Sequence, residues 1–224
     1  MEKVLNLSRR LKAAADLVRT GSVTADVGCD HGKLSAHLLL SGRAEFVYAT
    51  DIRKQPLEKA AALLSSEDLK GRYECVLTDG LQGLPGERIT DVVIAGVGDD
   101  VTEKIMSDAV WLRDPEKNIV LVPSSRHERV REFLAGSGFS TVSERAVYEH
   151  GHLYTVICAA YTGEKRQLDI RDKWLGRIDP GEPEGERYLA WILRRMRAIA
   201  DSIADPEHPS RREAEEVIDS LSDL

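Results

Sequence analysis

The sequence contains no apolar run as long as the roughly 18 residues that a membrane-spanning helix needs. Its 224 residues include only three cysteines, Cys29, Cys75 and Cys158, which are far apart and form no C-x-x-C pair. This spacing indicates neither a zinc site nor a disulfide framework. Charged side chains also interrupt the first twenty residues, which therefore lack the apolar core of a secretion signal. We expect a reduced, cytoplasmic protein with no metal ion and no membrane association.

A dinucleotide-binding fingerprint is also missing. In the stretch TADVGCDHGKL, a G-x-G-x-x-G pattern starting at Gly28 would need glycines at positions 30 and 33, where the chain has Asp30 and Lys33. An acid in this turn would repel a pyrophosphate and would suit a ligand that carries positive charge. S-adenosylmethionine has a sulfonium and an ammonium group and no phosphate. A plain strand-to-helix turn capped by Asp30 is the alternative.

Strand-like and helix-like segments alternate through the first 140 residues. This alternation is typical of βαβ units, in which helices cover both faces of a parallel sheet. The connection GLQGLPGER is rich in glycine and proline, which disfavours a helix there. The expected strands are 23–27, 46–51, 73–77, 91–95 and 118–122, and the expected helices are 5–18, 33–41, 54–65, 99–110 and 126–136.

The next two strand-like segments, 139–148 and 153–161, are joined by only four residues. A parallel crossover needs a dozen or more residues, so these two strands must be antiparallel. Five parallel strands followed by such a hairpin predict an α/β fold of the class I methyltransferase (Rossmann-like) type. This fold has a seven-stranded sheet with an antiparallel last strand.

The composition changes after residue 161. Residues 162–183 read as a polar linker with one helical turn at most, and apolar positions at helical spacing then run from 184 to 203. Proline residues break the pattern at 205–209, and Ser210 with Glu213 suggests a capping box for a last helix. We therefore predict a methyltransferase domain over residues 1–162 and a helical, coiled-coil-like hairpin over residues 163–224.

The ends of four consecutive predicted strands carry an acid, a glycine or both. Asp26 and Gly28 end the first strand, Asp51 the second, Asp79–Gly80 the third and Ala95–Gly98 the fourth. In a parallel α/β sheet the ligand lies outside the carboxyl ends of the strands, where an acid can take the ribose hydroxyls of an adenosine. Four such ends in series indicate an adenosine-type ligand.

The net charge of −7 is unevenly distributed. Residues 1–20 carry five basic and two acidic side chains, residues 165–197 nine and six, and residues 201–224 two and eight. The basic segments, with Arg9 in the first and Arg194, Arg195 and Arg197 in the second, suggest a stripe that binds nucleic-acid phosphates. Solvated helix faces would explain the same counts.

Several motifs resemble the bacterial tRNA (adenine(22)-N1)-methyltransferase family. They are LNLSRRL, ADVGCDHGKL, the acid of ATDI, TDGL, VVIAGVG and GHLYTVICA, and they run through most of residues 5–160. The resemblance implies methyl transfer from S-adenosylmethionine to N1 of an adenine in tRNA, at position 22, and a C-terminal domain that engages the tRNA. By that resemblance Asp26, Gly28, Asp30, Asp51, Asp79 and Gly80 would hold the methyl donor, and Gly96 to Gly98 would line the site of transfer. We also include Arg10, His31, Gly32, Ile52 and Ala95 in the predicted donor site.

Four positions depart from the family pattern. The family commonly has an aromatic residue at Lys33, proline at Ser35, glycine at Asp99 and glutamine at Val122. An aromatic side chain could stack on a target base, which a lysine does less well.

The 1-methyladenosine product is cationic, so a nearby carboxylate would stabilise the developing charge, and we predict Asp30 or Asp99 in that role. The predicted RNA contacts are Arg9, Lys33, Arg194, Arg195 and Arg197.

Two alternatives remain open at this stage. A methyltransferase of the same fold could act on another RNA base or on a small molecule. A non-catalytic relative could instead bind S-adenosylmethionine or RNA. For the oligomeric state we expect a monomer or a weak dimer.

Overall fold

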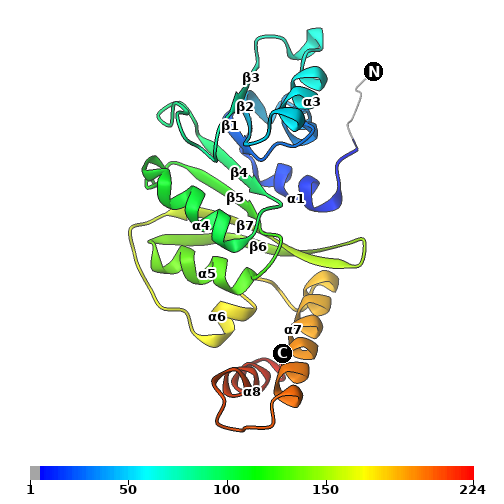
Figure 1. Cartoon of the computed structure of the whole chain (residues 1–224), viewed down its shortest axis with the longest axis vertical. Coiled ribbons are helices and arrows are strands. Elements are labelled where there is room, and N and C mark those ends of the chain that lie inside the picture. The colour runs from blue at the N-terminus through cyan, green and yellow to red at the C-terminus, as the bar shows by residue number, and fades with distance from the viewer. Residues whose placement is uncertain (1–5) are drawn as a thin grey trace.

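The computed structural model describes residues 6–224, which fold around one seven-stranded sheet (Figure 1). The strands lie in the order β3-β2-β1-β4-β5-β7-β6. The first five strands are parallel, and β7 runs antiparallel between β5 and β6, which confirms the predicted sheet. The strands are β1 Ser22–Val27, β2 Ala44–Asp51, β3 Tyr73–Leu77, β4 Asp91–Ala95, β5 Asn118–Val122, β6 Phe139–Glu149 and β7 His152–Tyr161.

Helices cover both faces of this sheet, as its alternating side chains require. Val93 and Val120 face a core shared with α1, α2 and α3, whereas Val92 and Ile119 face a second core shared with α4 and α5. No helix joins β3 to β4 across residues 78–90. The helices are α1 Arg9–Leu17, α2 Lys33–Leu40, α3 Lys54–Leu64, α4 Asp99–Asp108 and α5 His127–Gly136, with short 3₁₀ turns at η1 Glu67–Leu69 and η2 Val110–Leu112.

The first helix begins later than predicted. Residue 5, its expected start, lies outside the described residues, and the described helix starts at Arg9 because Ser8 caps it. The Ser8 backbone is extended, and its Oγ accepts a hydrogen bond from the Leu11 backbone N–H at 3.5 Å. A serine in this position satisfies one of the free N–H groups of the first turn.

The β6–β7 hairpin extends past the carboxyl edge of the sheet. Only Ile157–Ala159 of β7 pairs with β5, so the earlier half of β7 and the later half of β6 continue beyond it toward α1 and α7. The hairpin turns through His150 and Gly151, whose φ angles of 49° and 87° suit a two-residue turn. Its tip therefore stands at the edge where ligands bind to such sheets.

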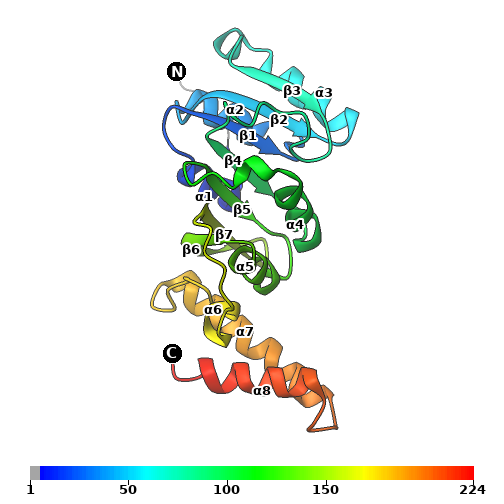
Figure 2. The same ribbon diagram turned by 90° about the vertical axis from the view of Figure 1, so that its left-hand side faces the viewer.

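The C-terminal helices form a third hydrophobic core at the β6–β7 end of the molecule (Figures 1 and 2). These helices are α6 Ile170–Trp174, α7 Pro183–Ser202 and α8 Pro209–Leu221. The helical hairpin is confirmed, but the predicted cap of its last helix is wrong. His208 caps α8, because Pro209 takes the first helical position, where its missing N–H costs nothing.

A buried polar network fastens α7 to the sheet domain. Arg131 of α5 donates to both Glu144 carboxylate oxygens and, at 3.1 Å, to the Tyr188 hydroxyl, which also lies 3.0 Å from His127 Nδ1. The Arg131 and Glu144 side chains are 3% and 0% exposed. Burial lowers the pKa of His127 to about 3, so this imidazole is neutral.

Within residues 6–224, no helix is both long and apolar enough to cross a bilayer.

Candidate functional site

A cavity of about 670 Å³ opens at the carboxyl ends of β1, β2 and β4. The turns that follow these strands form its floor, and the start of α1 forms one wall. Its position is the one predicted from the strand ends. The predicted residues that line it are Arg10, Asp26, Gly28, Asp30, His31, Lys33, Asp51, Ile52, Asp79, Gly80, Ala95 and Gly96.

Gly28 and Gly96 expose their backbone to this cavity. Their φ angles are +71° and +78°, in the left-handed region that favours glycine. A Cβ built on either residue would meet no heavy atom within 4 Å. The space that these side chains would enter is thus the cavity itself, and a ligand can approach the backbone closely at both turns.

Asp26 lies at the back of the cavity and is 2% exposed. Its Oδ2 accepts a hydrogen bond from Ser35 Oγ at 2.6 Å. Burial raises the pKa of Asp26 from 3.8 to about 6, and the Ser35 hydrogen bond opposes this rise. The serine that departs from the family pattern therefore supports the carboxylate, which at neutral pH can attract a ligand cation.

Asp51 joins two of the turns that form the cavity floor. Its Oδ2 accepts from the Asp30 backbone N–H at 3.3 Å, and its Oδ1 accepts from the Arg53 backbone N–H at 2.9 Å. The side chain is only 3% exposed yet lines the cavity. Next to it, Ile52 is 65% exposed and offers an apolar surface on the cavity wall. A buried acid beside an exposed apolar side chain suits a ribose with its flat base.

Asp30 and His31 lie at the open side of the cavity. Asp30 has a φ of 49°, its side chain is 61% exposed, and its Oδ1 is 3.5 Å from His31 Nε2. Asp79 is also partly exposed and pairs with Lys104 of α4 at 2.8 Å. Asp30 therefore adds negative charge to the rim of the cavity, whereas the charge of Asp79 is balanced by Lys104.

Among the residues predicted for the donor or for catalysis, three do not line this cavity. Gly32 is a packing glycine, because its Cβ would lie 2.9 Å from Ala60 Cβ of α3. Gly98 precedes α4, and a Cβ built on it would lie 3.7 Å from Ser125 Oγ. Asp99 is 4% exposed and forms ion pairs with two arginines, Arg126 at 2.8 Å and Arg129 at 3.4 Å. These contacts are not aligned hydrogen bonds, since neither Asp99 oxygen accepts one from the described residues.

Arg10 connects the cavity to the tip of the hairpin. Its Nη1 donates to Glu149 Oε2 at 2.5 Å, and its guanidinium lies 4.7 Å from the centre of the Tyr154 ring. Glu149 also accepts from the Arg9 backbone N–H. Glu149 and Tyr154 are not among the residues predicted from the sequence. A single acid at the end of a strand, such as Glu149, does not indicate a functional site unless it is known that the hairpin extends past the sheet.

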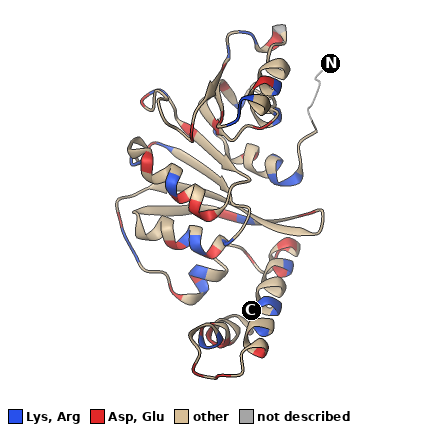
Figure 3. Cartoon of the chain, in the orientation of Figure 1, with Lys and Arg blue, Asp and Glu red and all other residues tan. Residues whose placement is uncertain are grey.

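The residues predicted to contact RNA do not lie together in the structure. Lys33 lines the cavity, whereas Arg9 binds the Tyr148 carbonyl and pairs with Glu184 at 2.6 Å, which ties α1 to the hairpin and to α7. Arg194 and Arg195 line a second cavity beside α7, and Arg197 is exposed outside both cavities. Several Lys or Arg positions are coloured along the ribbon of α7 in Figure 3, together with acidic positions. Val122, the remaining departure from the family pattern, is buried in the sheet.

The described residues contain no group of three or more His, Cys, Asp or Glu side chains that could hold a metal ion. The three cysteines are free thiols. Burial raises the pKa of the Cys29 thiol, which lines the cavity, so this thiol stays protonated.

Several known proteins are similar to this chain in sequence or in fold. It is 26% identical over 155 residues to the tRNA (adenine(22)-N(1))-methyltransferase of Bacillus subtilis strain 168, a match that covers 69% of this chain and 65% of that enzyme. A protein of the NADB-Rossmann superfamily from Streptococcus agalactiae has a TM-score of 0.86 at 23% identity, with 99% of this chain and 98% of that chain covered.

A third relative was solved with a ligand. The TrmK protein of M. capricolum, in complex with S-adenosyl-homocysteine, has a TM-score of 0.79 at 20% identity, covering 97% of this chain and 96% of that chain. At these identities the structures establish the fold. The family described as "Methyltransferase domain" matches residues 7–157, which is most of the sheet domain. This chain therefore belongs to the methyltransferase domain family.

Proposed function

We propose that this protein transfers the methyl group of S-adenosylmethionine to N1 of an adenine in tRNA. The observation that carries the proposal is the cavity at the carboxyl edge of the sheet, where a buried Asp51 and two glycine turns meet. The name of the Bacillus subtilis relative supports adenine 22 as the target.

The donor fits the residues of this cavity. In this proposal Asp51 accepts from the ribose hydroxyls, and Ile52 offers the adenine an apolar face; both residues line the cavity. Gly28 and Gly96 leave room for the methionine part against the backbone, and Asp26 attracts its cationic groups. When bound, the donor supplies an electrophilic methyl group on a sulfonium.

The protein needs little acid–base chemistry for this reaction, because adenine N1 already has a lone pair. Its main contribution is orientation, which can supply on the order of 7–11 kcal/mol. The product carries a positive charge, and in this proposal Asp30, which lies at the open side of the cavity, stabilises it. Asp99 is a poorer candidate because its carboxylate pairs with Arg126 and Arg129.

A comparison of two variants tests the role of Asp30. Asp30→Asn should lower the turnover number with S-adenosylmethionine saturating, and Asp99→Asn should not. Unchanged turnover in Asp30→Asn, with equal donor affinity measured by calorimetry, would remove Asp30 from the mechanism.

The experiment for the function itself offers labelled S-adenosylmethionine with unmodified tRNA transcripts. Label should enter tRNA, and a transcript with adenine 22 replaced by guanine should stay unlabelled. Labelling of both transcripts would indicate another target base. If the protein binds the donor but labels no RNA, the alternatives are a small-molecule acceptor or a non-catalytic binding role.

Three further predictions accompany the proposal. They are a cytoplasmic location, a monomer or weak dimer, and a division of the chain at residue 162 into a catalytic domain and a tRNA-engaging helical domain. The separate hydrophobic core of α6, α7 and α8 supports the division, although Ala146 of β6 also belongs to that core.

A further inference from the structure

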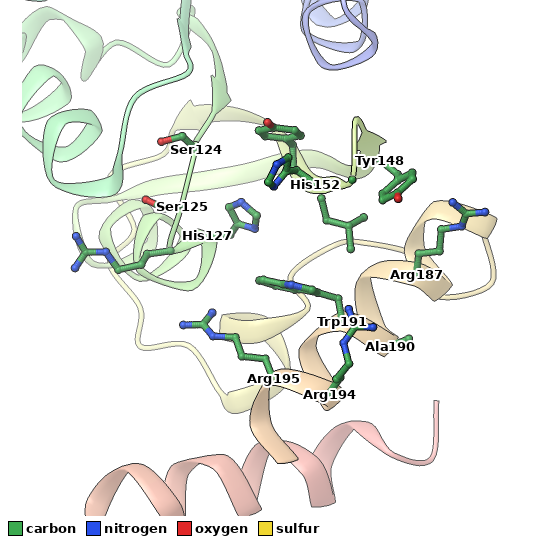
Figure 4. Close-up of a pocket in the computed structure, with 14 residues that line it drawn as sticks. Ser124, Ser125, His127, Tyr148, His152, Arg187, Ala190, Trp191, Arg194 and Arg195 are labelled. Carbon is green, nitrogen blue, oxygen red and sulfur yellow. The ribbon is translucent and has the colours of Figure 1, made fainter. Parts of the chain in front are cut away.

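A second cavity, of about 690 Å³, lies between α7, the hairpin tip and the loop that follows β5 (Figure 4). The side chains in Figure 4 converge on it from α5, from the hairpin and from α7. The α7 residues that line it recur every three or four positions, so they form one face of that helix. The lining residues on α7 are Arg187, Ala190, Trp191, Arg194 and Arg195.

This cavity is positively charged although the protein carries a net charge of −7. Four arginines line it and no carboxylate does. Two of them are balanced, since Arg126 pairs with Asp99 and Asp100, and Arg195 lies 3.6 Å from Glu128. Among the described residues, no ion pair or hydrogen bond engages the side chain of Arg187 or Arg194. Two exposed cations are therefore free to bind an anion.

Flat rings lie beside these cations. Trp191 is half-buried, and its ring centre is 5.5 Å from that of Tyr188 and 6.1 Å from that of His127. Arg187 lies over the Tyr148 ring at 5.1 Å. Because the His127 imidazole is neutral, the aromatic floor adds no charge. Phosphate-binding cations next to stacking rings are the features that proteins use for single-stranded nucleic acid.

The second cavity borders the proposed donor cavity. The Ser124 backbone N–H, in the second cavity, donates to the Val97 carbonyl, in the first, at 2.9 Å. On the hairpin side, Arg10 of the first cavity stacks on Tyr154 of the second. One layer of residues thus separates the two, and a single RNA strand can reach both.

We propose that the second cavity binds an unstacked nucleotide of the RNA substrate that lies close to the target adenine. Its base stacks on Trp191, and its phosphate groups pair with Arg187 and Arg194. This inference rests on the proposed function for the identity of the RNA. It adds that the protein separates two nucleotides from the RNA stack, one for methylation and one as an anchor.

The test measures the affinity of the full-length protein for an unmodified tRNA transcript and for S-adenosylmethionine. The double variant Arg187→Ala/Arg194→Ala should weaken tRNA binding and flatten its dependence on salt by about 0.7–0.9 in logarithmic slope for each phosphate that is no longer neutralised. Trp191→Ala should weaken it by about 5- to 150-fold, the range measured for base stacking. Trp191→Phe should restore most of the affinity. Donor affinity should not change in any of these variants.

A matched control removes an arginine at the opposite edge of the sheet. Arg113 is exposed just after η2, at the amino-terminal end of β5, and Arg113→Ala should bind tRNA like the parent protein. Trp191 also packs on Tyr188, so Trp191→Ala could unfold the protein. In that case the inference is tested by the double variant Arg187→Ala/Arg194→Ala alone. Equal tRNA affinity in the parent protein and the double variant would overturn the inference, as would an equal loss in Arg113→Ala.

The outcomes separate this inference from the proposed function. If the parent protein methylates tRNA while the double variant binds and methylates equally well, the inference fails and the function stands. If the parent protein binds tRNA without methylating it and the double variant loses that binding, the proposed function fails, whereas the assignment of the second cavity as a nucleotide-binding site stands. A protein that binds no RNA but captures an acidic protein through Arg187 and Arg194 would contradict the inference.

Discussion

Comparing Gly28→Ala with Gly42→Ala should distinguish the effect of an added methyl group on donor binding from its effect on backbone strain. Gly28 and Gly42 both have a φ of +71°, and a Cβ on either would meet no heavy atom within 4 Å. Alanine in the left-handed region costs about 1–2 kcal/mol. Both variants should therefore lose about 1–2 kcal/mol of stability, which lowers the melting temperature by about 2–8 °C in a protein of this size. Of these two glycines, only Gly28 borders the proposed donor cavity.

The difference between the two variants should appear in donor binding. A methyl group placed in occupied space typically costs 1–3 kcal/mol, so Gly28→Ala should weaken S-adenosylmethionine binding by about 5- to 150-fold. Gly42→Ala, in the turn after α2 at the opposite edge of the sheet, should bind the donor with unchanged affinity. Titration calorimetry on both variants measures this directly. Equal donor affinities in the two would refute the assignment of the cavity.

Three further predictions concern buried charge. Glu144→Gln should destabilise the fold by about 3–5 kcal/mol in urea unfolding, because it leaves the Arg131 guanidinium buried without its partner; a small change would mean that water reaches the pair. The native state holds a proton on Asp26 between pH 3.8 and about 6, so stability should fall by about 3 kcal/mol as pH rises through this window, and Asp26→Asn should abolish that slope. Asp99→Asn should leave donor affinity unchanged, because Asp99 pairs with Arg126 outside the cavity; weaker binding in calorimetry would place Asp99 at the donor.

The sequence predicts best what depends on neighbouring residues in the chain. The strands, their order of appearance and the reversed hairpin follow from local spacing and from the short link before His152. That Asp26 and Asp51 line one cavity could be predicted for the same reason, because parallel strands bring their carboxyl ends to one edge.

What the sequence could not predict depends on contacts between distant segments. Gly32 carries the same turn signal as Gly28, but its Cβ would contact Ala60 of the next helix. The ion pair of Asp99 with Arg126 could not be predicted, because Arg126 lies in the loop between β5 and α5, 27 residues later in the chain. The second cavity needs the overhang of the β6–β7 hairpin, which only the partial pairing of β7 with β5 reveals.

The measurement that tests the central claim most directly is identification of the methylated nucleoside. Unmodified tRNA would be incubated with the protein and S-adenosylmethionine carrying a deuterated methyl group, then digested and analysed by mass spectrometry against standards of each methyladenosine. The account predicts labelled 1-methyladenosine, which should disappear when Asp51 is replaced by alanine. Label on another atom or base, or none from a protein that binds the donor, would contradict it.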